Sequence, residues 1–588
     1  MIQAAIEPGV LEEQYERTVR EDIERFRGEA NAWMAGTLSD DRFRAARLRR
    51  GVYGQRQAGV HMVRTKVPGG MLTAAQVRQL ARAADEYGQG RGHITTRQNM
   101  QFHFVPLPRV AGLLHLLADA RLTTREACYN TVRNVTACPL SGLLKDEVFD
   151  VRPYARRTAF AFLHNPLTDS LPRKFKIAFS GCKDDCVEAA INDVGLRALI
   201  RDGRRGFRMS IGGGLGPLPN EARLLHDFVP EEELIGRIEA VIRVFDRHGN
   251  RENKNKARLK FVLRERGFEW LRDAIEKEYE GILRDGGIAA PVEAPEGFGG
   301  FESAPPPLAN GASLPVVRDH SADAEFDRWR ETNVVEQKEP GYAAAFVSVP
   351  QGNLTAAQMR TLARLSESAG DSRVRFTVSQ NAVLAYLPAH SLQRVYSALK
   401  VADLARPGAG EISDIVTCPG AWTCNLGLTK TMNLGEALAR TVSGYTDPSV
   451  KRLSIKASGC PNACGQHWTG DVGFYGNARK VDGREIPYYQ MLLGGGYDRE
   501  GNMRFGLAIS SVAARLAPLA VQRVLDHYVA HRAPGEAFRD YVLRHRVEFF
   551  RGMLADLAKP PEIAPELYKD WGDEEDFSLQ LGRGECAS

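Results

Sequence analysis

Four cysteines in the C-terminal half have the spacing of ligands to a redox cluster. Cys418 and Cys424 are separated by five residues in TCPGAWTC, and Cys460 and Cys464 are separated by three in SGCPNACG. Four thiolates are the usual ligand set of a 4Fe–4S cluster, and soft sulfur also suits zinc. Zinc sites usually pair cysteines about two to four residues apart, so the five-residue gap favours a cluster over zinc.

A similar but incomplete set occurs in the N-terminal half. Cys138, Cys182 and Cys186 match three of the four ligands, and Leu144 stands where the remaining one would be. Three cysteines make a poor site for a cubane, so we interpret them as remnants of a duplication. A second cluster is the alternative. Cys586, in the polar tail GRGECAS, is expected to be a free surface thiol.

The N-terminal half is richer in cations that could bind a small oxyanion. Arg64, Arg133, Lys174 and Lys176 align mostly with neutral residues of the other half. Arginine binds an oxyanion as a planar fork, while lysine acts as a point charge and proton donor. Together they predict an anion site, although solvated surface cations are the alternative for each of them.

An internal duplication organises the chain. Residues 67–76 (VPGGMLTAAQ) recur as residues 349–358 (VPQGNLTAAQ), at an offset of 282, and Gln98 recurs at the same offset as Gln380. The cysteine blocks follow in the same order. This pattern predicts one long unit that was duplicated and fused. We therefore expect pseudo-twofold symmetry, a ligand held between the halves, and a Pro/Gly-rich linker over about residues 288–314.

Helix and strand signals within each copy predict a mixed fold. Thr73 and Thr355 are expected to be helix N-caps, and apolar residues follow Thr73 at helical spacing. Residues 94–96 and 101–105 have the composition of short strands. Strands mixed with helices predict an α/β or α+β fold.

Composition and charge exclude several classes of protein. The 588 residues suggest three or four domains. The composition, with 43% hydrophobic and 26% charged residues, excludes wholesale disorder. A net charge of +5 is too small to indicate a nucleic-acid binder, although it suits a small acidic partner. Neither a membrane span nor a signal peptide is evident, so we expect a cytoplasmic location and reduced thiols.

The cysteine motifs resemble the signature of the siroheme- and 4Fe–4S-containing sulfite/nitrite reductases, in particular the ferredoxin-dependent type. The similarity extends over about residues 51–568 and includes MVRTKVPGG, TTRQNMQFH, VRNV and LPRKFK. It implies that the Cys464 thiolate holds the cluster and also caps the siroheme iron. It places Arg64, Arg133, Lys174 and Lys176 around the substrate anion.

The same resemblance implies further cofactor contacts. Arg97 and His103 would lie against siroheme. The carboxylates of siroheme need further cations, for which Lys256 and Arg258 in the run 251–260 are candidates, with a solvated loop and helix as the alternative. Asn462 would form hydrogen bonds near the cluster. Tyr53 and Cys128 flank the pocket segments; a thioether between them is a further hypothesis, with an unmodified thiol as the alternative.

The resemblance also implies a division into domains. Residues 1–50 would form an arm packed on the third domain. Residues 51–127 and 335–408 would form a composite parachute domain of two ferredoxin-like halves. Residues 128–334 would be the first siroheme-binding domain, including the linker, and residues 409–588 the second, which carries the cluster cysteines.

The implied reaction is the six-electron reduction of sulfite to sulfide. Electrons would come from an acidic donor such as ferredoxin, or from a flavoprotein subunit, because no nucleotide-binding fingerprint is evident. Reduction of nitrite to ammonia is the main competing interpretation, although Gln101-Phe102-His103 is more similar to the sulfite-reducing branch. The sequence also admits a non-catalytic electron-transfer subunit and a zinc-stabilised binding module.

Overall fold

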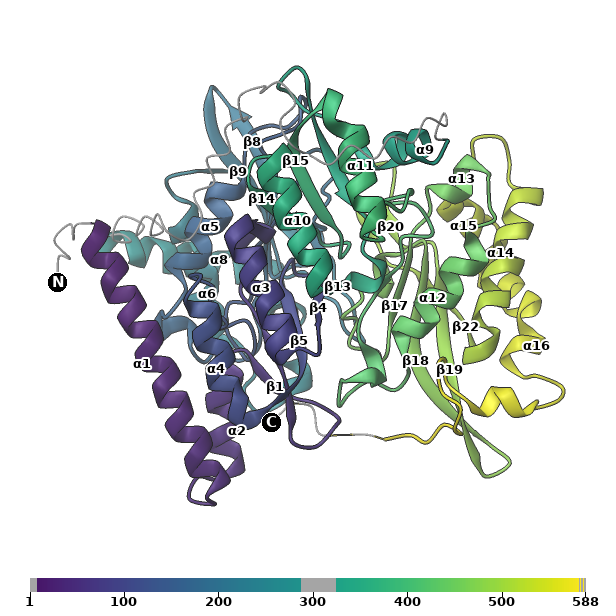
Figure 1. Cartoon of the computed structure of the whole chain (residues 1–588), viewed down its shortest axis with the longest axis horizontal. Coiled ribbons are helices and arrows are strands. Elements are labelled where there is room, and N and C mark those ends of the chain that lie inside the picture. The colour runs from purple at the N-terminus through teal and green to yellow at the C-terminus, as the bar shows by residue number, and fades with distance from the viewer. Residues whose placement is uncertain (1–7, 287–323, 581, 583–584, 586–588) are drawn as a thin grey trace.

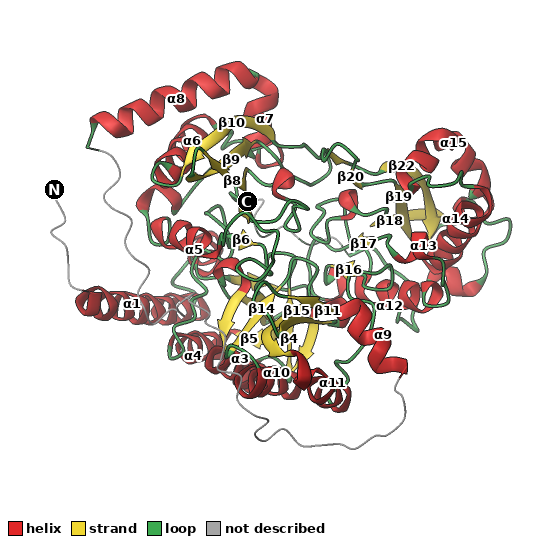
Figure 2. Cartoon of the chain, turned by 90° about the horizontal axis from the view of Figure 1, so that it is seen from above, coloured by secondary structure: helices red, strands yellow, loops and turns green. Residues whose placement is uncertain are grey.

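The computed structural model describes residues 8–286, 324–580, 582 and 585. The predicted linker over residues 288–314 and the predicted surface thiol Cys586 lie outside these residues. The chain forms three units, which meet around loops at the centre of the molecule (Figure 1 and Figure 2). Among the described helices, none is long and apolar enough to cross a bilayer.

The central unit consists of two five-stranded sheets that exchange edge strands. β13 of the second half pairs with β4 of the first, and β3 of the first half pairs with β14 of the second. The first sheet has the order β1 (Val52–Gly54), β2 (Val60–Arg64), β5 (Met100–Pro106), β4 (Arg91–Ile94) and β13 (Asn353–Thr355). The second has the order β11 (Val334–Glu336), β12 (Tyr342–Val347), β15 (Ala382–Pro388), β14 (Arg373–Phe376) and β3 (Met71–Thr73). The exchange makes one composite unit, which we call the parachute unit.

Helices cover the outer face of the parachute sheets (Figure 2). They are α3 (Ala74–Tyr87), α4 (Leu107–Ala118), α9 (Ala324–Asn333), α10 (Ala356–Ala369) and α11 (Leu392–Val401). The predicted N-caps are confirmed, because the Thr73 side chain accepts from the Gln76 N–H at 3.1 Å and the Thr355 side chain from the Gln358 N–H at 3.2 Å. The apolar positions predicted for the first of these helices are buried: Val77, Leu80, Ala81 and Ala84.

The strand predictions for this unit are confirmed in part. β5 contains the predicted strand 101–105, whereas β4 ends at Ile94, so the prediction of a strand over 94–96 is wrong beyond its first residue. The Thr95 hydroxyl donates to Asn99 Oδ1 at 2.6 Å and accepts from the Arg97 N–H at 3.0 Å. Such side-chain hydrogen bonds compete with a strand ladder and form a turn instead.

Two α/β units repeat one plan. The first has the sheet order β10 (Arg223–Pro230), β9 (Arg204–Ile211), β8 (Val194–Arg201), β7 (Ile177–Ser180) and β6 (Thr136–Ala137), with helices α5 (Arg152–Ala161), α6 (Leu234–His248), α7 (Leu259–Arg266) and α8 (Phe268–Arg284). The second has β16 (Val416–Thr417), β17 (Ile455–Ser458), β18 (Val472–Val481), β19 (Arg484–Leu493) and β22 (Leu507–Ala513). It also contains the ribbon β20 (Gly496–Tyr497) and β21 (Met503–Arg504), and the helices α12 (Thr431–Val442), α13 (Pro448–Lys451), α14 (Ala517–His531), α15 (Phe538–Met553) and α16 (Ala555–Ala558). The predicted α/β fold with an internal duplication is confirmed.

Two equivalent glutamines join the parachute unit to the α/β units. Gln98 Nε2 donates to the carbonyls of Ala137 and Phe376, both at 2.8 Å. Gln380 Nε2 donates to the Ile94 carbonyl at 3.0 Å, and its Oε1 accepts from the Thr417 N–H at 2.9 Å. Loops fill the centre of the molecule where the three units meet (Figure 2). The duplication therefore converges on a junction made of loops.

The structure corrects the predicted place of the N-terminal arm. α1 (Pro8–Met34) packs on α4 of the parachute unit rather than on the third domain, and α2 (Asp40–Arg49) follows it. Ile23 and Phe26 share the hydrophobic core of the parachute unit, so apolar burial determines where the arm lies. We retain the other domain limits predicted from the sequence as a proposal.

Replacing Gln98 by alanine is expected to lower the thermal unfolding midpoint by several degrees. The substitution leaves two carbonyls and the Ala137 N–H without their partner, and each unpaired buried group costs roughly 1–3 kcal/mol. Scanning calorimetry measures the midpoint. Gln393→Ala, at an exposed position of α11, is the matched control; equal midpoints for both variants would contradict the role of Gln98.

Candidate active site

The second α/β unit brings the four predicted cluster cysteines together. Cys418 and Cys460 follow β16 and β17, which are neighbouring parallel strands, so both lie at the same edge of the sheet. Cys424 follows the short helix η8 (Gly420–Trp422). Burial, and then the charge of Cys464, raises the pKa of Cys418 to about 12 and raises the pKa values of Cys424 and Cys460. The charge of Cys464 therefore acts on the other three thiols, which places the four cysteines close together.

This donor set fits an iron–sulfur cluster. The Gly459 N–H donates to Cys418 Sγ at 3.2 Å, and Asn462 Nδ2 donates to Cys460 Sγ at 3.5 Å. A Cβ at Gly459 would lie 2.6 Å from the Gly420 Cα, so glycine permits this close packing. Buried thiolates that repel one another are stabilised by bound iron cations.

Cations from the other copy of the duplication face these cysteines. Burial, followed by the charges of Arg97, Arg258 and Lys174, lowers the pKa of Lys176, whereas the charge of Cys464 raises it. Burial lowers the pKa of Arg97 to about 9, and Arg133 is the next cause. The structure thus places Lys176 near Cys464, with Arg97, Lys174 and Arg258 near Lys176 and with Arg133 near Arg97.

Asp193 positions two of these cations. Its Oδ2 accepts from the Lys176 backbone N–H at 2.8 Å, and its carboxylate forms a two-point ion pair with the Arg258 guanidinium at 3.1 and 2.7 Å. Asn192 Oδ1 accepts from Arg97 Nη1 at 2.7 Å. The sequence does not identify Asp193 as a site residue, since no motif distinguishes a positioning carboxylate.

Arg64 and Arg133 meet at one carbonyl. Arg133 Nε donates to the Ala127 oxygen at 2.8 Å, and Arg64 Nη1 lies 3.5 Å from the same atom. The Arg64 guanidinium also lies over the Tyr53 ring, 5.6 Å from its centroid. These contacts place both arginines beside the segment that contains Cys128. A thioether between Tyr53 and Cys128 stays a prediction.

His103 and Lys256 have very different environments. His103 on β5 is buried, and its ring lies 5.4 Å from the Trp422 ring. Trp422 belongs to residues 418–427, which we call the cluster loop. Neither of its ring nitrogens has a hydrogen-bond partner among the described residues, and a cavity of about 230 Å³ adjoins it. These nitrogens are available to a cofactor carboxylate or water. Lys256 is exposed in the short helix η4 (Lys254–Lys256), and its cofactor contact stays a prediction.

Arg56 is a neighbour of the cluster loop that the motifs did not reveal. Burial lowers the pKa of the Arg56 guanidinium, and the charge of Cys424 opposes this shift. Its backbone N–H donates to the Thr423 carbonyl at 3.0 Å, and its guanidinium donates to the Gly427 carbonyl. A turn of the parachute unit therefore closes over the cluster loop, and this packing carries no sequence signal.

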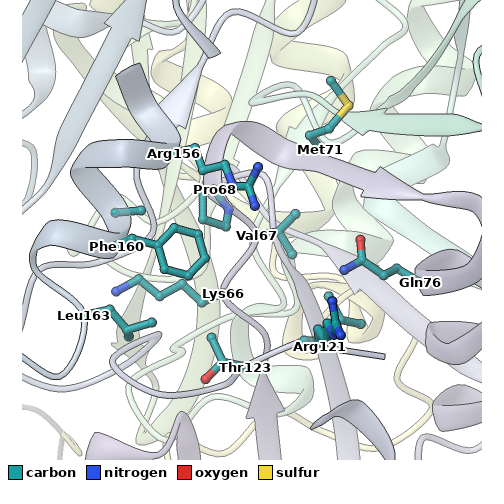
Figure 3. A pocket seen from close by; sticks show the side chains of 12 residues that line it. Lys66, Val67, Pro68, Met71, Gln76, Arg121, Thr123, Arg156, Phe160 and Leu163 are labelled. Atoms are coloured by element: carbon teal, nitrogen blue, oxygen red, sulfur yellow. The ribbon is translucent and has the colours of Figure 1, made fainter. Parts of the chain in front are cut away.

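A separate pocket between the parachute unit and the first α/β unit lies away from the predicted site residues. Figure 3 shows Lys66, Arg156 and Phe160 in its wall, and its cavity of about 30 Å³ is near the size of one or two water molecules. Lys66 Nζ pairs with Glu126 at 3.2 Å, where both side chains are buried. None of the predicted site residues lines this pocket.

Comparisons with known proteins define the class to which this site belongs. The family model for the nitrite and sulphite reductase 4Fe-4S domain matches residues 128–283, and the model for the nitrite/sulfite reductase ferredoxin-like half domain matches residues 53–120 and 335–402. The chain belongs to the nitrite and sulfite reductase family. Siroheme and a 4Fe–4S cluster, both predicted from the sequence, are the cofactors of this family.

Some relatives that resemble the chain over most of its length are named nitrite reductases, and others are named sulfite reductases. It is 29% identical to the assimilatory ferredoxin-dependent nitrite reductase of Haloferax mediterranei, over 90% of this chain and 89% of that protein. It is 28% identical to a ferredoxin-dependent sulfite reductase of Mycobacterium tuberculosis, over 83% of each. The solved structure of the Mycobacterium tuberculosis NirA protein has a TM-score of 0.73 and 27% identity, over 88% of this chain and 92% of that one.

Changing Cys460 to serine is expected to remove the cluster. The variant should lose about four iron atoms and about four acid-labile sulfides per chain, because the remaining three thiolates make an incomplete ligand set. Elemental analysis and a sulfide assay measure the loss. Cys586→Ser is the matched control and should retain both contents; a Cys460→Ser protein with unchanged iron and sulfide would contradict this assignment.

Proposed function

We propose that this protein reduces sulfite to sulfide in a six-electron reaction. The observation that supports it most is a group of neighbouring cations that reaches Cys464 through Lys176. Its other members are Arg97, Lys174 and Arg258 near Lys176, and Arg133 near Arg97. A concentration of positive charge at a cofactor junction favours a small, strongly charged oxyanion. Siroheme and the 4Fe–4S cluster would supply the electrons when bound, with Cys418, Cys424, Cys460 and Cys464 as cluster ligands.

The side chains of the chain itself would bind the anion and deliver protons. Arg64 and Arg133, which meet at the Ala127 carbonyl, would hold the substrate oxygens. Lys174 and Lys176 would donate protons as those oxygens leave. The lowered pKa of Lys176 makes its ammonium a stronger acid than an ordinary lysine, which favours this role near neutral pH.

A second set of residues would bind the siroheme rather than the substrate. The carboxylates of a tetrapyrrole need cations, which Arg97, Arg258 and Lys256 would provide. Because Asp193 already neutralises much of the Arg258 charge, we assign Arg258 a weaker electrostatic part than Arg97. His103, whose ring nitrogens have no hydrogen-bond partner among the described residues, would complete the set.

We infer that the electron donor is ferredoxin. Similar proteins named as ferredoxin-dependent include both nitrite and sulfite reductases, and the net charge of +5 suits an acidic partner. A flavoprotein subunit is the alternative donor. A cytoplasmic location is part of the same proposal, since the thiols would then stay reduced.

Nitrite is the second candidate substrate. Several similar proteins are named ferredoxin–nitrite reductase, so this alternative has direct support. Sulfite is favoured by its charge and shape, because a doubly charged anion with three oxygens makes fuller use of two arginines and two lysines. His103 adds to this preference through its place in the segment similar to the sulfite-reducing branch.

Replacing Lys176 by alanine is expected to lower turnover about 10²–10³-fold while both cofactors stay bound. The change removes a charge and a proton donor, but the backbone N–H that binds Asp193 remains. Visible absorption and iron content measure cofactor binding, and sulfide release measures turnover. Lys277→Ala, at an exposed position on α8, is the control; near-normal turnover of Lys176→Ala would remove Lys176 from the reaction.

With one chemically reduced donor, we expect kcat/KM for sulfite to exceed kcat/KM for nitrite by about tenfold or more. The comparison uses the purified holoenzyme and follows consumption of each anion under identical conditions. Because the donor is common to both reactions, the ratio reports the anion pocket. If kcat/KM is higher for nitrite than for sulfite, nitrite becomes the proposed substrate, and the family assignment is unchanged.

A further inference from the structure

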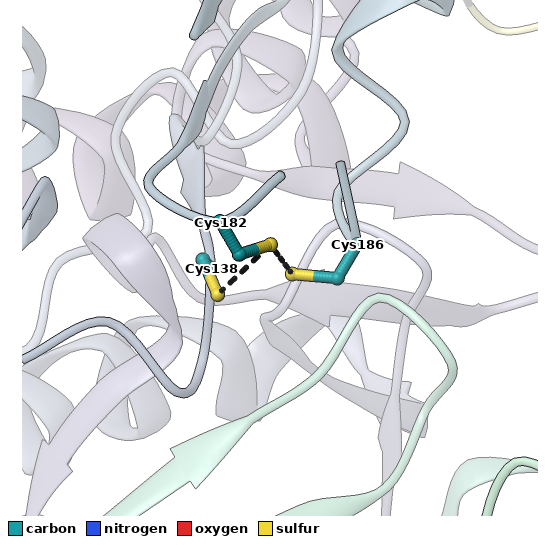
Figure 4. Close-up of side chains that lie close together, drawn as sticks. All are labelled: Cys138, Cys182 and Cys186. Atoms are coloured by element: carbon teal, nitrogen blue, oxygen red, sulfur yellow. Dashed lines mark hydrogen bonds between the residues drawn. The ribbon is translucent and has the colours of Figure 1, made fainter. Parts of the chain in front are cut away.

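The three cysteines interpreted as remnants form a compact group of sulfur atoms. Cys138 Sγ lies 3.9 Å from Cys182 Sγ, and Cys182 Sγ lies 3.6 Å from Cys186 Sγ. All three sulfur atoms lie within 4.8 Å of one another, and Figure 4 shows them pointing toward a common point. The duplicated fold explains how this group arises, because Cys138 and Cys182 follow the neighbouring parallel strands β6 and β7.

The separation of these sulfur atoms matches a single metal ion. Four ligands at the Zn–S distance of about 2.3 Å form a tetrahedron with edges of about 3.8 Å. The two measured separations, 3.9 and 3.6 Å, lie on either side of that value. Soft thiolates select zinc and iron–sulfur centres over the harder cations.

The corresponding cysteines of the other copy do not share this compactness. Within the described part of the chain, the sulfur atoms of Cys418, Cys424, Cys460 and Cys464 do not form a group within 4.8 Å of one another. A cubane holds its ligands farther apart than one ion does, because each sulfur binds a different iron. At equivalent sheet edges, the sulfur atoms therefore lie close together in the N-terminal copy and farther apart in the C-terminal copy.

We propose that Cys138, Cys182 and Cys186 bind one zinc ion. Binding forms three Zn–S bonds and releases the three thiol protons to solvent, with no change of oxidation state. No fourth His, Cys, Asp or Glu ligand atom among the described residues joins the group, so a water molecule completes the tetrahedron. Cys186 is exposed, which gives the ion a route from solvent, while Cys138 is buried and anchors the site.

The site would stiffen a loop that connects two units of the molecule. The segment that carries Cys182 and Cys186 contains Asp185 between them and continues to Glu188. The Tyr497 hydroxyl donates to Asp185, and the Lys456 ammonium pairs with Glu188, both across the boundary with the second α/β unit. A zinc ion that fixes this loop would support the contact between the α/β units.

Three thiols without a metal are the simplest competing explanation. The S–H group is a weak hydrogen-bond donor, so it gives little reason for three sulfur atoms to gather. A disulfide between Cys182 and Cys186 would also remove the ligands. A second 4Fe–4S cluster would require the sulfur atoms to spread apart. Each of these states has its own elemental or mass signature.

Elemental analysis of the full-length holoenzyme tests the proposal. The protein is purified without chelator, equilibrated with Zn²⁺ and then desalted before the measurement. We expect about one zinc per chain in addition to the iron of the cofactors. Cys182→Ser should lose this zinc and keep its iron and acid-labile sulfide, whereas Cys586→Ser should keep all three. X-ray absorption at the zinc edge of the wild-type protein should show three sulfur neighbours at about 2.3 Å, and this measurement does not depend on how any variant folds.

Several results would overturn the proposal. They are a wild-type protein without zinc after the Zn²⁺ treatment, a zinc edge without sulfur neighbours, or zinc that persists in Cys182→Ser. About four additional irons and sulfides would establish a second cluster instead. An intact-mass deficit of two hydrogens, reversed by a reductant and assigned to Cys182 and Cys186, would establish a disulfide.

Discussion

Everything in this molecule depends on keeping sulfur ligands and a group of like-charged cations close together inside a protein. The pKa of Cys418 is raised, and those of Lys176 and Arg97 are lowered, because burial opposes their charged forms. Neither group is stable alone at such a density. Their mutual attraction, and the iron and carboxylates of the cofactors, offset the repulsion within each group. The fold provides the rigid frame that this arrangement needs.

The frame is a duplication whose copies were specialised in different directions. The parachute unit exchanges β3 and β13, so neither half can form its sheet without the other. Gln98 and Gln380 then hold the equivalent strands β6 and β16 of the two α/β units, because each side-chain oxygen accepts a backbone N–H from its strand at 2.9 Å. One copy contributes the complete cysteine set and the other contributes most of the cations. The junction is therefore asymmetric in chemistry although its scaffold is nearly symmetric.

The same sheet edge supports two kinds of sulfur site. In both copies a cysteine follows each of two neighbouring parallel strands, and backbone geometry there is alike. The difference is the fourth position, where Cys424 stands in one copy and Leu144 in the other. The three sulfur atoms of Cys138, Cys182 and Cys186 lie within 4.8 Å of one another, the separation expected of a mononuclear site.

The sequence by itself determined the elements whose signals are local or repeated. Capping threonines, the apolar face of α3, the α/β class and the duplication depend on spacing along the chain, and the structure confirms them. The four-cysteine motif was recognisable for the same reason, since it is short and specific. The strand predicted over 94–96 was wrong beyond Ile94, because a Thr95 side chain competes for backbone groups in a way that composition does not reveal.

Tertiary structure alone decided which distant residues share a site. Asp193 binds Lys176 and Arg258, Arg56 closes over the cluster loop, and α1 packs on α4, although none of these pairings leaves a pattern in the sequence. The proposal of a zinc site at Cys138, Cys182 and Cys186 also depends on the tertiary structure, because the sequence does not give the distances between their sulfur atoms. Such contacts are set by how whole units pack, and packing depends on shape and burial summed over many residues rather than on any one spacing.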